Sequence, residues 1–476
     1  MPPAHATAFI GRAPELAALH QLHAQPGCHI AVVYGRRRIG KTALINRAFA
    51  DQFTLSFEGL ENRGKRVQID NFLFQLERQA GVRIARIKAI RQWREAFIEL
   101  VPLLKDKHVI LFLDEMQWIA NYRSDLVSDL KMVWEQYLIK AGRITLVLCG
   151  SIASFMERKV VKSKALYGRT DLTIHLKPFL LPETRHLLTH FGEEDVLLAQ
   201  LLVGGVPQYL NLLSQQPSVA AAMDQLAFTK SGFFSEEFER IFVSHFGASE
   251  IYGRIVGLLA DAPYGLSRAE ILDKLRLSAG GELTQNLYNM ESAGFIATYS
   301  PLGRSAGVRQ QRFLIEDPFL RFYFAFLEPY KKQGIYQEHH FTQYVLPSPR
   351  FTSWLGRSFE LLCLQHREPI ARLLGFHGIQ YAAGPWFQHG KRGVLQGAQF
   401  DLVFDRADRV VTACEIKYRS APIGVEVIKE MEAKLAAAVV FQKRTVQRVL
   451  ITKSEPTREL QASSYFSRIV RATELF

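Results

Sequence analysis

The feature that most constrains this chain is a strand, a glycine loop and a helix, written CHIAVVYGRRRIGKTALINRAF at residues 28–49. The loop fits the pattern G-x-x-x-x-G-K-[ST], with Gly35, Gly40, Lys41 and Thr42 at the fixed positions. Glycines let the backbone wrap closely around phosphates, so that its N–H groups and the start of the following helix face the anion. Lys41 suits the β- and γ-phosphates of ATP, and Thr42 suits a Mg²⁺ ion. The predicted nucleotide-binding residues of this loop are Gly35, Arg36, Arg37, Arg38, Ile39, Gly40, Lys41, Thr42 and Ala43.

A second strand, HVILFLDEMQW at residues 108–118, ends in two carboxylates. Its continuous apolar run predicts a buried strand of a parallel sheet. Asp114 and Glu115 then lie at the carboxyl end of that strand, where ligands bind in open α/β sheets. We expect Asp114 to help hold Mg²⁺ and Glu115 to orient or deprotonate the water that attacks the phosphate.

Three further features near this site leave alternatives open. Ser151 follows the strand RITLVLCGS and suits either a γ-phosphate contact or the N-cap of the next helix. Arg169, in LYGRTDL, suits either an arginine finger, in cis or in trans, or an ordinary salt bridge. The three loop arginines, at positions 36–38, are expected to form a solvated rim that favours phosphate.

Several ordered motifs resemble the archaeal-type ATPases of the STAND/AAA-like P-loop superfamily. They are FIGRAPELAAL at residues 9–19, GRRRIGKT, LDEMQW, CGS, YGRTD and GGVPQYL at residues 204–210. The resemblance implies an α/β fold with a P-loop NTPase sheet of five parallel strands, in which the Asp114 strand is not adjacent to the P-loop strand. It also places Gly11, Arg12 and Glu15 near the nucleotide base, and Gly205 and Pro207 in a helical lid.

Size and charge narrow the function further. At 476 residues the chain is too long for one ordinary core, and its net charge of +13 favours polyanion partners, with nucleic acid, DNA above all, preferred to a membrane surface. The four cysteines are scattered without CxxC spacing, which fits a reducing cytoplasm better than a disulfide framework. We expect no signal peptide and no membrane helix, and a homo-oligomer is compatible with the sequence.

The middle of the chain changes in character. Residues 181–240 show the helical periodicity of a lid, and residues 241–335 predict three helices and a hairpin, as in a winged helix. Ser267 and Glu270 predict a capping box. Arg304, Arg309 and Arg312 give the hairpin a basic tip, and Gln285 and Asn289 on the third helix suit base contacts. Because this third helix lacks Lys and Arg, an interaction or structural module is favoured over a sequence-specific DNA reader.

The C-terminal part carries a second candidate site. Glu360 lies in an apolar helix (SWLGRSFELLCLQH), Asp401 in a strand (QFDLVF), and Glu415 and Lys417 in the next strand (CEIKY). Asp401 and Glu415 supply oxygen ligands for Mg²⁺, which activates water and polarises a phosphate. Lys417 is expected to act on the phosphate or water, and Glu360 as an outer carboxylate or as a ligand of a second metal ion. The alternative is a surface hairpin with a Glu–Lys salt bridge.

The order of these residues resembles the restriction-endonuclease-like PD-(D/E)xK fold, and such a tail is common in the archaeal-type ATPase family. We therefore predict four domains: an ATPase core at 1–180, a lid at 181–240, a winged helix at 241–335 and a nuclease-like domain at 336–476. The expected function is a cytoplasmic ATPase whose nucleotide state controls a Mg²⁺-dependent nuclease acting on DNA. The alternative is an ATP-driven switch that binds nucleic acid without cutting it.

Overall fold

The computed structural model describes residues 9–84, 89–120, 125–247, 249–262, 264–278, 280–299, 311–334, 336–388, 397–438, 441 and 444–476. Arg304 and Arg309, which were predicted to form the basic hairpin tip, lie outside these residues. The chain divides into two compact units, the first ending at Pro178 and the second beginning at Phe179. Among the described residues, no helix is long and apolar enough to cross a bilayer.

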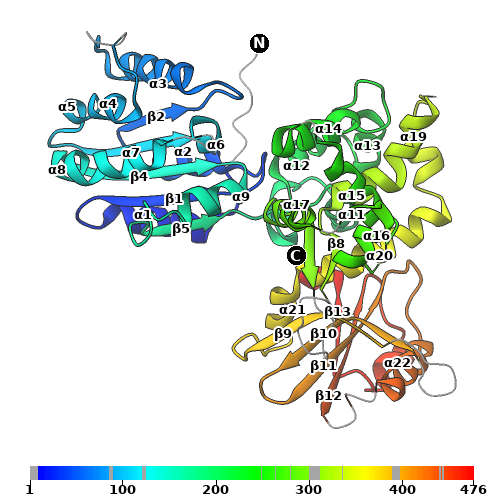
Figure 1. Ribbon diagram of the computed structural model, residues 1–476. Helices are drawn as coiled ribbons and strands as arrows, with labels where there is room; N and C mark the ends of the chain where they lie inside the picture. The colour runs from blue at the N-terminus through cyan, green and yellow to red at the C-terminus, as the bar shows by residue number, and fades with distance from the viewer. Residues whose placement is uncertain are drawn as a thin grey trace. The chain divides into compact units, whose positions relative to one another are not determined.

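The first unit is built on a five-stranded parallel sheet (Figure 1). The strands are β1 (His29–Tyr34), β2 (Thr54–Glu58), β3 (His108–Asp114), β4 (Arg143–Gly150) and β5 (Leu172–His175), in the order β2-β3-β4-β1-β5. β4 therefore separates β3, which ends at Asp114, from the P-loop strand β1. This confirms the predicted five parallel strands and the predicted separation of the two motif strands.

Helices cover both faces of this sheet, because its strands are apolar on both sides. α1 (Ala13–Ala24) and α2 (Lys41–Ala48) bury their leucines against one face, in a core that includes Val33, Phe112 and Val147. The opposite face packs against α3 (Lys65–Ala80), α4 (Trp93–Ile98) and α7 (Leu126–Val133). The shorter elements of the unit are α5 (Val101–Leu104), α6 (Met116–Ile119), η1 (Trp134–Leu138), α8 (Ile139–Ala141), α9 (Ala153–Phe155) and η2 (Met156–Val161).

The second unit begins with the helices predicted as a lid. They are α10 (Leu181–Leu187), α11 (Glu193–Val203), α12 (Pro207–Leu213), α13 (Val219–Leu226) and α14 (Phe233–Phe246). Gly205 precedes α12, and a Cβ at this position would lie 1.8 Å from the carbonyl oxygen of Phe179. The close approach lets the Phe179 N–H donate to the Gly205 carbonyl at 2.7 Å, so only glycine fits.

A three-helix segment follows at residues 249–315. It contains α15 (Glu250–Ala260), β6 (Leu266–Ser267), α16 (Arg268–Leu275), α17 (Gly281–Ser292), β7 (Ile296–Tyr299) and β8 (Arg312–Ile315). The strands pair antiparallel in the order β6-β8-β7. Ser267 caps α16 and forms the predicted capping box with Glu270. The lid helices and this segment share one continuous apolar core.

An aromatic helical stretch leads on to the C-terminal part. It comprises α18 (Pro318–Phe322), η4 (Tyr323–Leu327), α19 (Glu328–Gln333) and η5 (Phe341–Val345). Phe319, Phe322 and Tyr323 are buried, so these three rings belong to the core and are not a surface for stacking bases.

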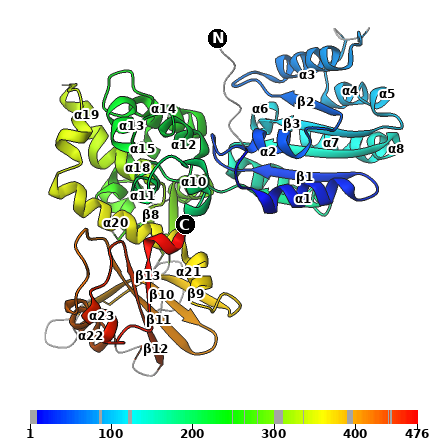
Figure 2. The ribbon, with the colours of Figure 1, turned by 180° about the vertical axis from the view of Figure 1, so that it is seen from behind.

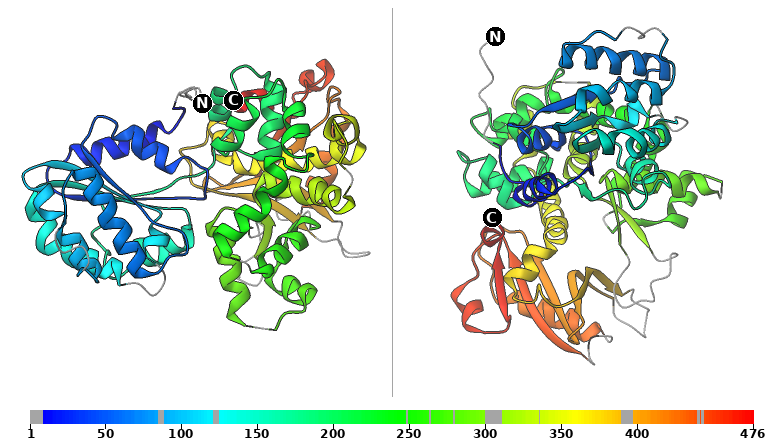
Figure 3. Two further views of the ribbon diagram at one scale, coloured as in Figure 1. Left: turned by 90° about the horizontal axis from the view of Figure 1, so that it is seen from above. Right: turned by 90° about the vertical axis from the view of Figure 1, so that its left-hand side faces the viewer.

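The C-terminal segment, residues 349–476, is a five-stranded mixed sheet with helices (Figure 2). Its elements are α20 (Pro349–Gln365), α21 (Arg367–Leu373), β9 (Tyr381–Gln388), β10 (Ala398–Arg406), β11 (Val410–Lys417), α22 (Glu426–Ala437), β12 (Thr445–Thr452), α23 (Arg458–Ala462), β13 (Arg468–Arg471) and η7 (Ala472–Leu475). The order is β13-β12-β11-β10-β9, with β9, β10 and β11 antiparallel and β11, β12 and β13 parallel. Figure 3 gives two further views of both units.

His366, between α20 and α21, ties this segment to the start of the lid. Its Nε2 accepts a hydrogen bond from the Leu181 N–H at 3.0 Å, and its Nδ1 lies 2.9 Å from the Leu362 carbonyl oxygen, to which it donates. The ring is fully buried, and burial lowers the His366 pKa from its ordinary 6.5 to about 4. Both contacts need the neutral ring with its proton on Nδ1.

The His366 ring predicts that the second unit loses stability in mild acid. Because the folded-state pKa is depressed, the stabilisation is complete above pH 6.5 and is lost as the pH falls towards 4. The loss approaches about 3 kcal/mol. We expect the calorimetric Tm of His366→Gln to fall less steeply with pH between 6.5 and 4 than that of the wild type. The exposed His377→Gln is the control, and an unchanged slope in His366→Gln would contradict the assignment.

Candidate functional sites

The phosphate loop connects β1 to α2, and its glycines are required by geometry. Gly40 caps α2 with φ 89°, a conformation that residues with a Cβ rarely adopt. Gly35 has φ 155°, and a Cβ there would lie 2.4 Å from the Leu176 carbonyl oxygen. The backbone therefore turns directly from the buried strand into the helix, as phosphate binding at a helix N-terminus requires.

The two predicted nucleotide motifs meet at the carboxyl ends of β1 and β3. Thr42 Oγ1 donates to Asp114 Oδ2 at 2.7 Å. Lys41 is buried, and its Nζ donates to the Arg36 carbonyl at 3.1 Å. A hydroxyl and a carboxylate oxygen side by side are the hard donors that Mg²⁺ prefers. The residues present thus fit a Mg²⁺ ion held by Thr42 and Asp114.

Glu115 is held by two side chains from neighbouring elements. Ser151 Oγ, after β4, donates to Glu115 Oε2 at 2.8 Å, and Gln117 Nε2 donates to the same oxygen. Gln117 also binds the Ser151 Oγ at 2.9 Å and accepts from the Ser151 N–H at 3.1 Å. The N-cap alternative for Ser151 is wrong, because Ile152 is the N-cap of α9. Gln117 was missed from the sequence, although it stands in the motif LDEMQW.

This arrangement predicts separate effects on ATP binding and turnover. Glu115→Gln keeps the side-chain shape but removes the carboxylate that would act on water, so we expect ATP to bind with a near-normal Kd while hydrolysis falls about 100-fold or more. Gln117→Ala should change kcat much less, because it leaves the carboxylate in place. Binding of a fluorescent ATP analogue and steady-state phosphate release measure the two properties. Hydrolysis by Glu115→Gln at the wild-type rate would exclude Glu115 as the residue that acts on water.

The arginines near the loop are arranged differently from the expected solvated rim. Arg36 is only 5% exposed, so that expectation is wrong for it. Arg37 lies over the Trp118 ring at 5.4 Å. Arg12 has φ 62°, follows Gly11 at φ 67°, and donates to the Lys177 carbonyl at 2.7 Å. This hydrogen bond attaches the Gly11–Arg12 pair to the segment that follows β5.

Arg169 pairs with Glu135 at 2.6 Å, and this contact matches the salt-bridge alternative for Arg169. Glu58, at the end of β2, lies opposite Asp114 in the sheet register. Burial and the nearby Asp114 and Glu115 raise the Glu58 pKa. Its position at the strand end, in TLSFEGL, was the sequence signal that could have found it.

In the C-terminal segment, Glu415 binds two ammonium groups. It is 1% exposed, and Lys434 Nζ, on α22, contacts its two carboxylate oxygens at 2.8 and 2.6 Å. Lys417 Nζ lies 2.9 Å from Glu415 Oε1 and 2.5 Å from Glu430 Oε2. The buried carboxylate is therefore compensated on both sides, which is what its burial requires. The surface-hairpin alternative is wrong in one respect, because Glu415 is buried.

Asp401 and Glu360 lie near this ion pair and line one cavity together. Burial and the neighbouring Asp401 raise the Glu360 pKa to about 7, and the ion pair with Arg357 opposes this. Burial also raises the Asp401 pKa; Lys434 opposes this, and Glu415 adds to it. Three carboxylates thus repel one another in a poorly solvated site, and cationic side chains partly offset the repulsion.

The chemistry of this cluster fits a divalent cation, although the present arrangement favours lysine. Carboxylate oxygens of Asp401 and Glu415 are suitable Mg²⁺ ligands, and a cation would relieve their mutual repulsion. Within the ranges that the structure covers, however, no three Asp, Glu, His or Cys side chains are grouped closely enough to hold a metal ion. A cation bound by Glu415 would replace a contact that Lys434 now makes.

Three residues of this cluster were not predicted from the sequence: Arg357, Glu430 and Lys434. Glu430 and Lys434 stand four residues apart on α22, so they share one helix face, and this face points to β11. Arg357 stands three residues before Glu360 on α20. The sequence shows the helical spacing of these residues, but it does not show which strand each helix contacts.

The third helix of the three-helix segment, α17, uses its polar residues internally. Asn289 donates to the Tyr252 hydroxyl at 3.0 Å, and Gln285 donates to Asn289 at 2.7 Å. Both side chains that were expected to suit base contacts are thus engaged in hydrogen bonds within the fold.

The comparisons with known proteins extend from the first unit into the second. Residues 9–213 match the family described as an ATPase domain predominantly from Archaea. An uncharacterised protein of Methanocaldococcus jannaschii is 26% identical over 322 residues, which are 67% of this chain and 69% of that protein.

Solved structures that are similar to the chain include two archaeal proteins. A Walker-type ATPase of Pyrococcus abyssi has a TM-score of 0.49 and 17% identity, covering 66% of this chain and 96% of that one. The ORC2 protein of Aeropyrum pernix, in ADPNP and ADP complexes, has a TM-score of 0.44 and 15% identity, covering 68% and 97%. Residues 9–213 thus match an archaeal-type ATPase domain, and the matched range includes the P-loop, Asp114 and Glu115.

Proposed function

We propose that ATP binding and hydrolysis in the first unit control a Mg²⁺-dependent nuclease in the C-terminal segment, which acts on DNA. The observation that carries the nuclease proposal is the grouping of Glu360, Asp401, Glu415 and Lys417. Glu360 and Asp401 line one cavity, and Lys417 contacts Glu415. They come from α20, β10 and β11. The ATPase part of the proposal rests on the family match.

In the ATPase domain, each motif residue has a separate task. The P-loop backbone and Lys41 would bind the β- and γ-phosphates, and Thr42 with Asp114 would hold Mg²⁺, which neutralises charge on those phosphates. Glu115 would orient the attacking water, and Ser151 with Gln117 keep this carboxylate at one position. Ser151 donates a hydrogen bond to Glu115, so a contact between Ser151 and the γ-phosphate would make the position of Glu115 depend on the bound nucleotide.

In the C-terminal segment, Asp401 and Glu415 would hold the cation, which supplies Lewis-acid activation of the scissile phosphate and of water. Lys417 also contacts Glu430, so its ammonium would stay at the site if Glu415 bound a cation. There it can stabilise charge that develops on the phosphate. Glu360 is the outer carboxylate, and its raised pKa suits proton transfer near neutral pH.

A second candidate is an ATP-driven switch whose C-terminal segment binds nucleic acid without cutting it. The observation that favours it is the Lys434 ammonium, which contacts both oxygens of Glu415. A carboxylate held in this way is a structural ion pair rather than a vacant ligand. The test is incubation of the full chain with supercoiled plasmid, with Mg²⁺ or EDTA, and with or without ATP. Nicking that needs Mg²⁺ and changes with ATP supports the nuclease, whereas gel retardation without nicking supports the switch.

The net charge of +13 predicts that nucleic-acid binding depends on salt. Each neutralised phosphate releases counterions, so log K should fall linearly with log [KCl], by about 0.9 per contact on duplex DNA. Fluorescence anisotropy of labelled DNA at rising KCl measures the slope. Absence of binding at low salt, or an affinity that does not change with KCl, would contradict a nucleic-acid partner.

A further inference from the structure

A groove runs between the three-helix segment and the C-terminal segment, within the second unit. It consists of three adjoining cavities of about 270, 20 and 370 Å³. The first two share Tyr299 and Leu361, and the last two share Tyr264, Phe387 and Gln399, so they form a continuous series. The middle, narrow cavity is the one lined by Glu360 and Asp401.

The narrow point is closed by a contact between the two segments. Arg357, which pairs with Glu360, lies over the Tyr264 ring at 5.0 Å. The Tyr264 carbonyl accepts hydrogen bonds from the Tyr299 hydroxyl at 2.6 Å and from Arg312 Nε at 3.0 Å. A cavity of about 20 Å³ holds little more than one water molecule. The cavity beside the two carboxylates therefore has no room for a nucleotide while Tyr264 and Arg357 are in contact.

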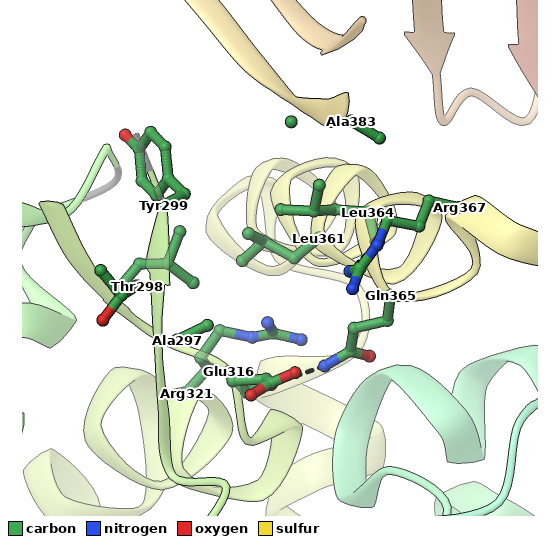
Figure 4. Close-up of a pocket in the computed structure, with 12 residues that line it drawn as sticks. Ala297, Thr298, Tyr299, Glu316, Arg321, Leu361, Leu364, Gln365, Arg367 and Ala383 are labelled. Carbon is green, nitrogen blue, oxygen red and sulfur yellow. Dashed lines mark hydrogen bonds between the residues drawn. The ribbon is translucent and has the colours of Figure 1, made fainter. Parts of the chain in front are cut away.

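The first wide cavity has the chemistry of a phosphate site. Figure 4 shows Arg321, from α18, and Arg367, from α21, extending into it, beside Gln365 and Glu316. The Gln365 amide donates to the Glu316 carbonyl at 2.9 Å, so this side of the cavity is fixed. The Arg321 Nε makes no hydrogen bond to any residue within the described ranges, and burial lowers the pKa of this guanidinium to about 10. Arg321 Nη1 donates to the Ile315 carbonyl at 3.5 Å, and the charges of Asp317 and Glu316 act on the same guanidinium, so an anion here would add the contact to Nε.

The second wide cavity combines an aromatic ring with a cation. Arg312, from β8, lies 6.0 Å from the Phe387 ring on β9, and Tyr264, half exposed, lines the same cavity. Aromatic rings beside guanidinium groups are the elements on which the bases of single-stranded nucleic acid stack while its phosphates are neutralised. A double helix offers its bases only at their edges and cannot use these rings.

We propose that this groove binds a single strand of nucleic acid and passes it across Glu360 and Asp401. The proposal rests on the proposed nuclease and names the form of its substrate. Bases of the strand stack at Phe387 and Tyr264, its phosphates lie at Arg321 and Arg367, and its entry separates Tyr264 from Arg357.

The test measures binding of the full chain in EDTA, so that no cutting is needed. Labelled oligothymidylate, oligouridylate and a DNA duplex, each of about 20 nucleotides or base pairs, serve as probes because this length exceeds one typical single-strand site. We expect both single strands to bind at least about 10-fold more tightly than the duplex. A preference for one single strand identifies DNA or RNA as the substrate.

Variants then locate the site. Arg321→Gln with Arg367→Gln should weaken single-strand binding about 10-fold and reduce the slope of log K against log [KCl] by about 1.4, since each phosphate contact contributes about 0.7. Phe387→Ala should weaken binding about 5-fold or more through lost stacking. The controls are Arg372→Gln, on the same helix as Arg367, and the exposed Tyr344→Ala. If the double variant does not fold, the single variant Arg367→Gln is measured in its place.

The outcomes separate this inference from the nuclease proposal. If the groove variants bind single strands more weakly but the wild type does not cut in Mg²⁺, the groove proposal is supported and the nuclease proposal is contradicted. Duplex cutting without any preference for single strands contradicts the groove and supports the nuclease. If the groove variants melt at the wild-type temperature but bind single strands with unchanged affinity and salt slope, the groove proposal is also wrong.

Discussion

Lys41→Ala is expected to reduce ATP hydrolysis by about 100-fold or more, because the charge on the β- and γ-phosphates then has no ammonium group to neutralise it. Lys41 is 6% exposed and its Nζ now binds the Arg36 carbonyl, so the ammonium is already positioned inside the loop. Phosphate release from ATP, with titration of a fluorescent analogue, measures turnover and binding.

The matched control is Lys140→Ala, an exposed lysine of α8 in the same unit. It should hydrolyse ATP at the wild-type rate and melt at the wild-type temperature. If Lys41→Ala turns over ATP as fast as Lys140→Ala does, the loop is not the catalytic phosphate site.

The second large effect concerns DNA cleavage. Asp401→Asn, Glu415→Gln and Lys417→Ala should each abolish Mg²⁺-dependent cleavage. The first two variants remove ligands of the Mg²⁺ ion, and the third removes the ammonium group that acts on the phosphate. Their Tm values should differ. Asp401→Asn removes one of three repelling carboxylates and should leave the Tm unchanged or raised. Glu415→Gln removes the buried carboxylate that Lys434 and Lys417 both contact and should lower the Tm.

Lys417→Ala distinguishes the catalytic role from a structural one. Glu415 keeps Lys434 in this variant, so we expect the Tm to fall by only a few degrees while cleavage is lost. Lys429→Ala, an exposed lysine of α22, is the control for charge and should cut normally. Full cleavage by Lys417→Ala, or no cleavage by the wild type on single-stranded, duplex or branched DNA, would exclude the proposed active site.

Local features of both candidate sites could be predicted from the amino-acid sequence alone. The P-loop, the strand that ends at Asp114, the capping box of Ser267 and Glu270, and the hairpin that carries Asp401 and Glu415 are each encoded within a few residues. Such features depend on backbone sterics and on the period of apolar residues, which act over short distances along the chain. For the same reason the apolar run of β3 indicated a buried parallel strand before any partner was known.

Which side chains meet depends on how the elements pack in three dimensions. Lys434 reaches Glu415 because α22 packs beside the sheet, and Gln117 meets Ser151 because β4 lies next to β3. Tyr264 covers Arg357 only because the three-helix segment and α20 fold into one unit. Contacts between residues far apart in the chain depend on how whole elements pack, and no local pattern records them. The sequence therefore identified the reactive groups, while the fold determined their neighbours, their charge balance and the route to them.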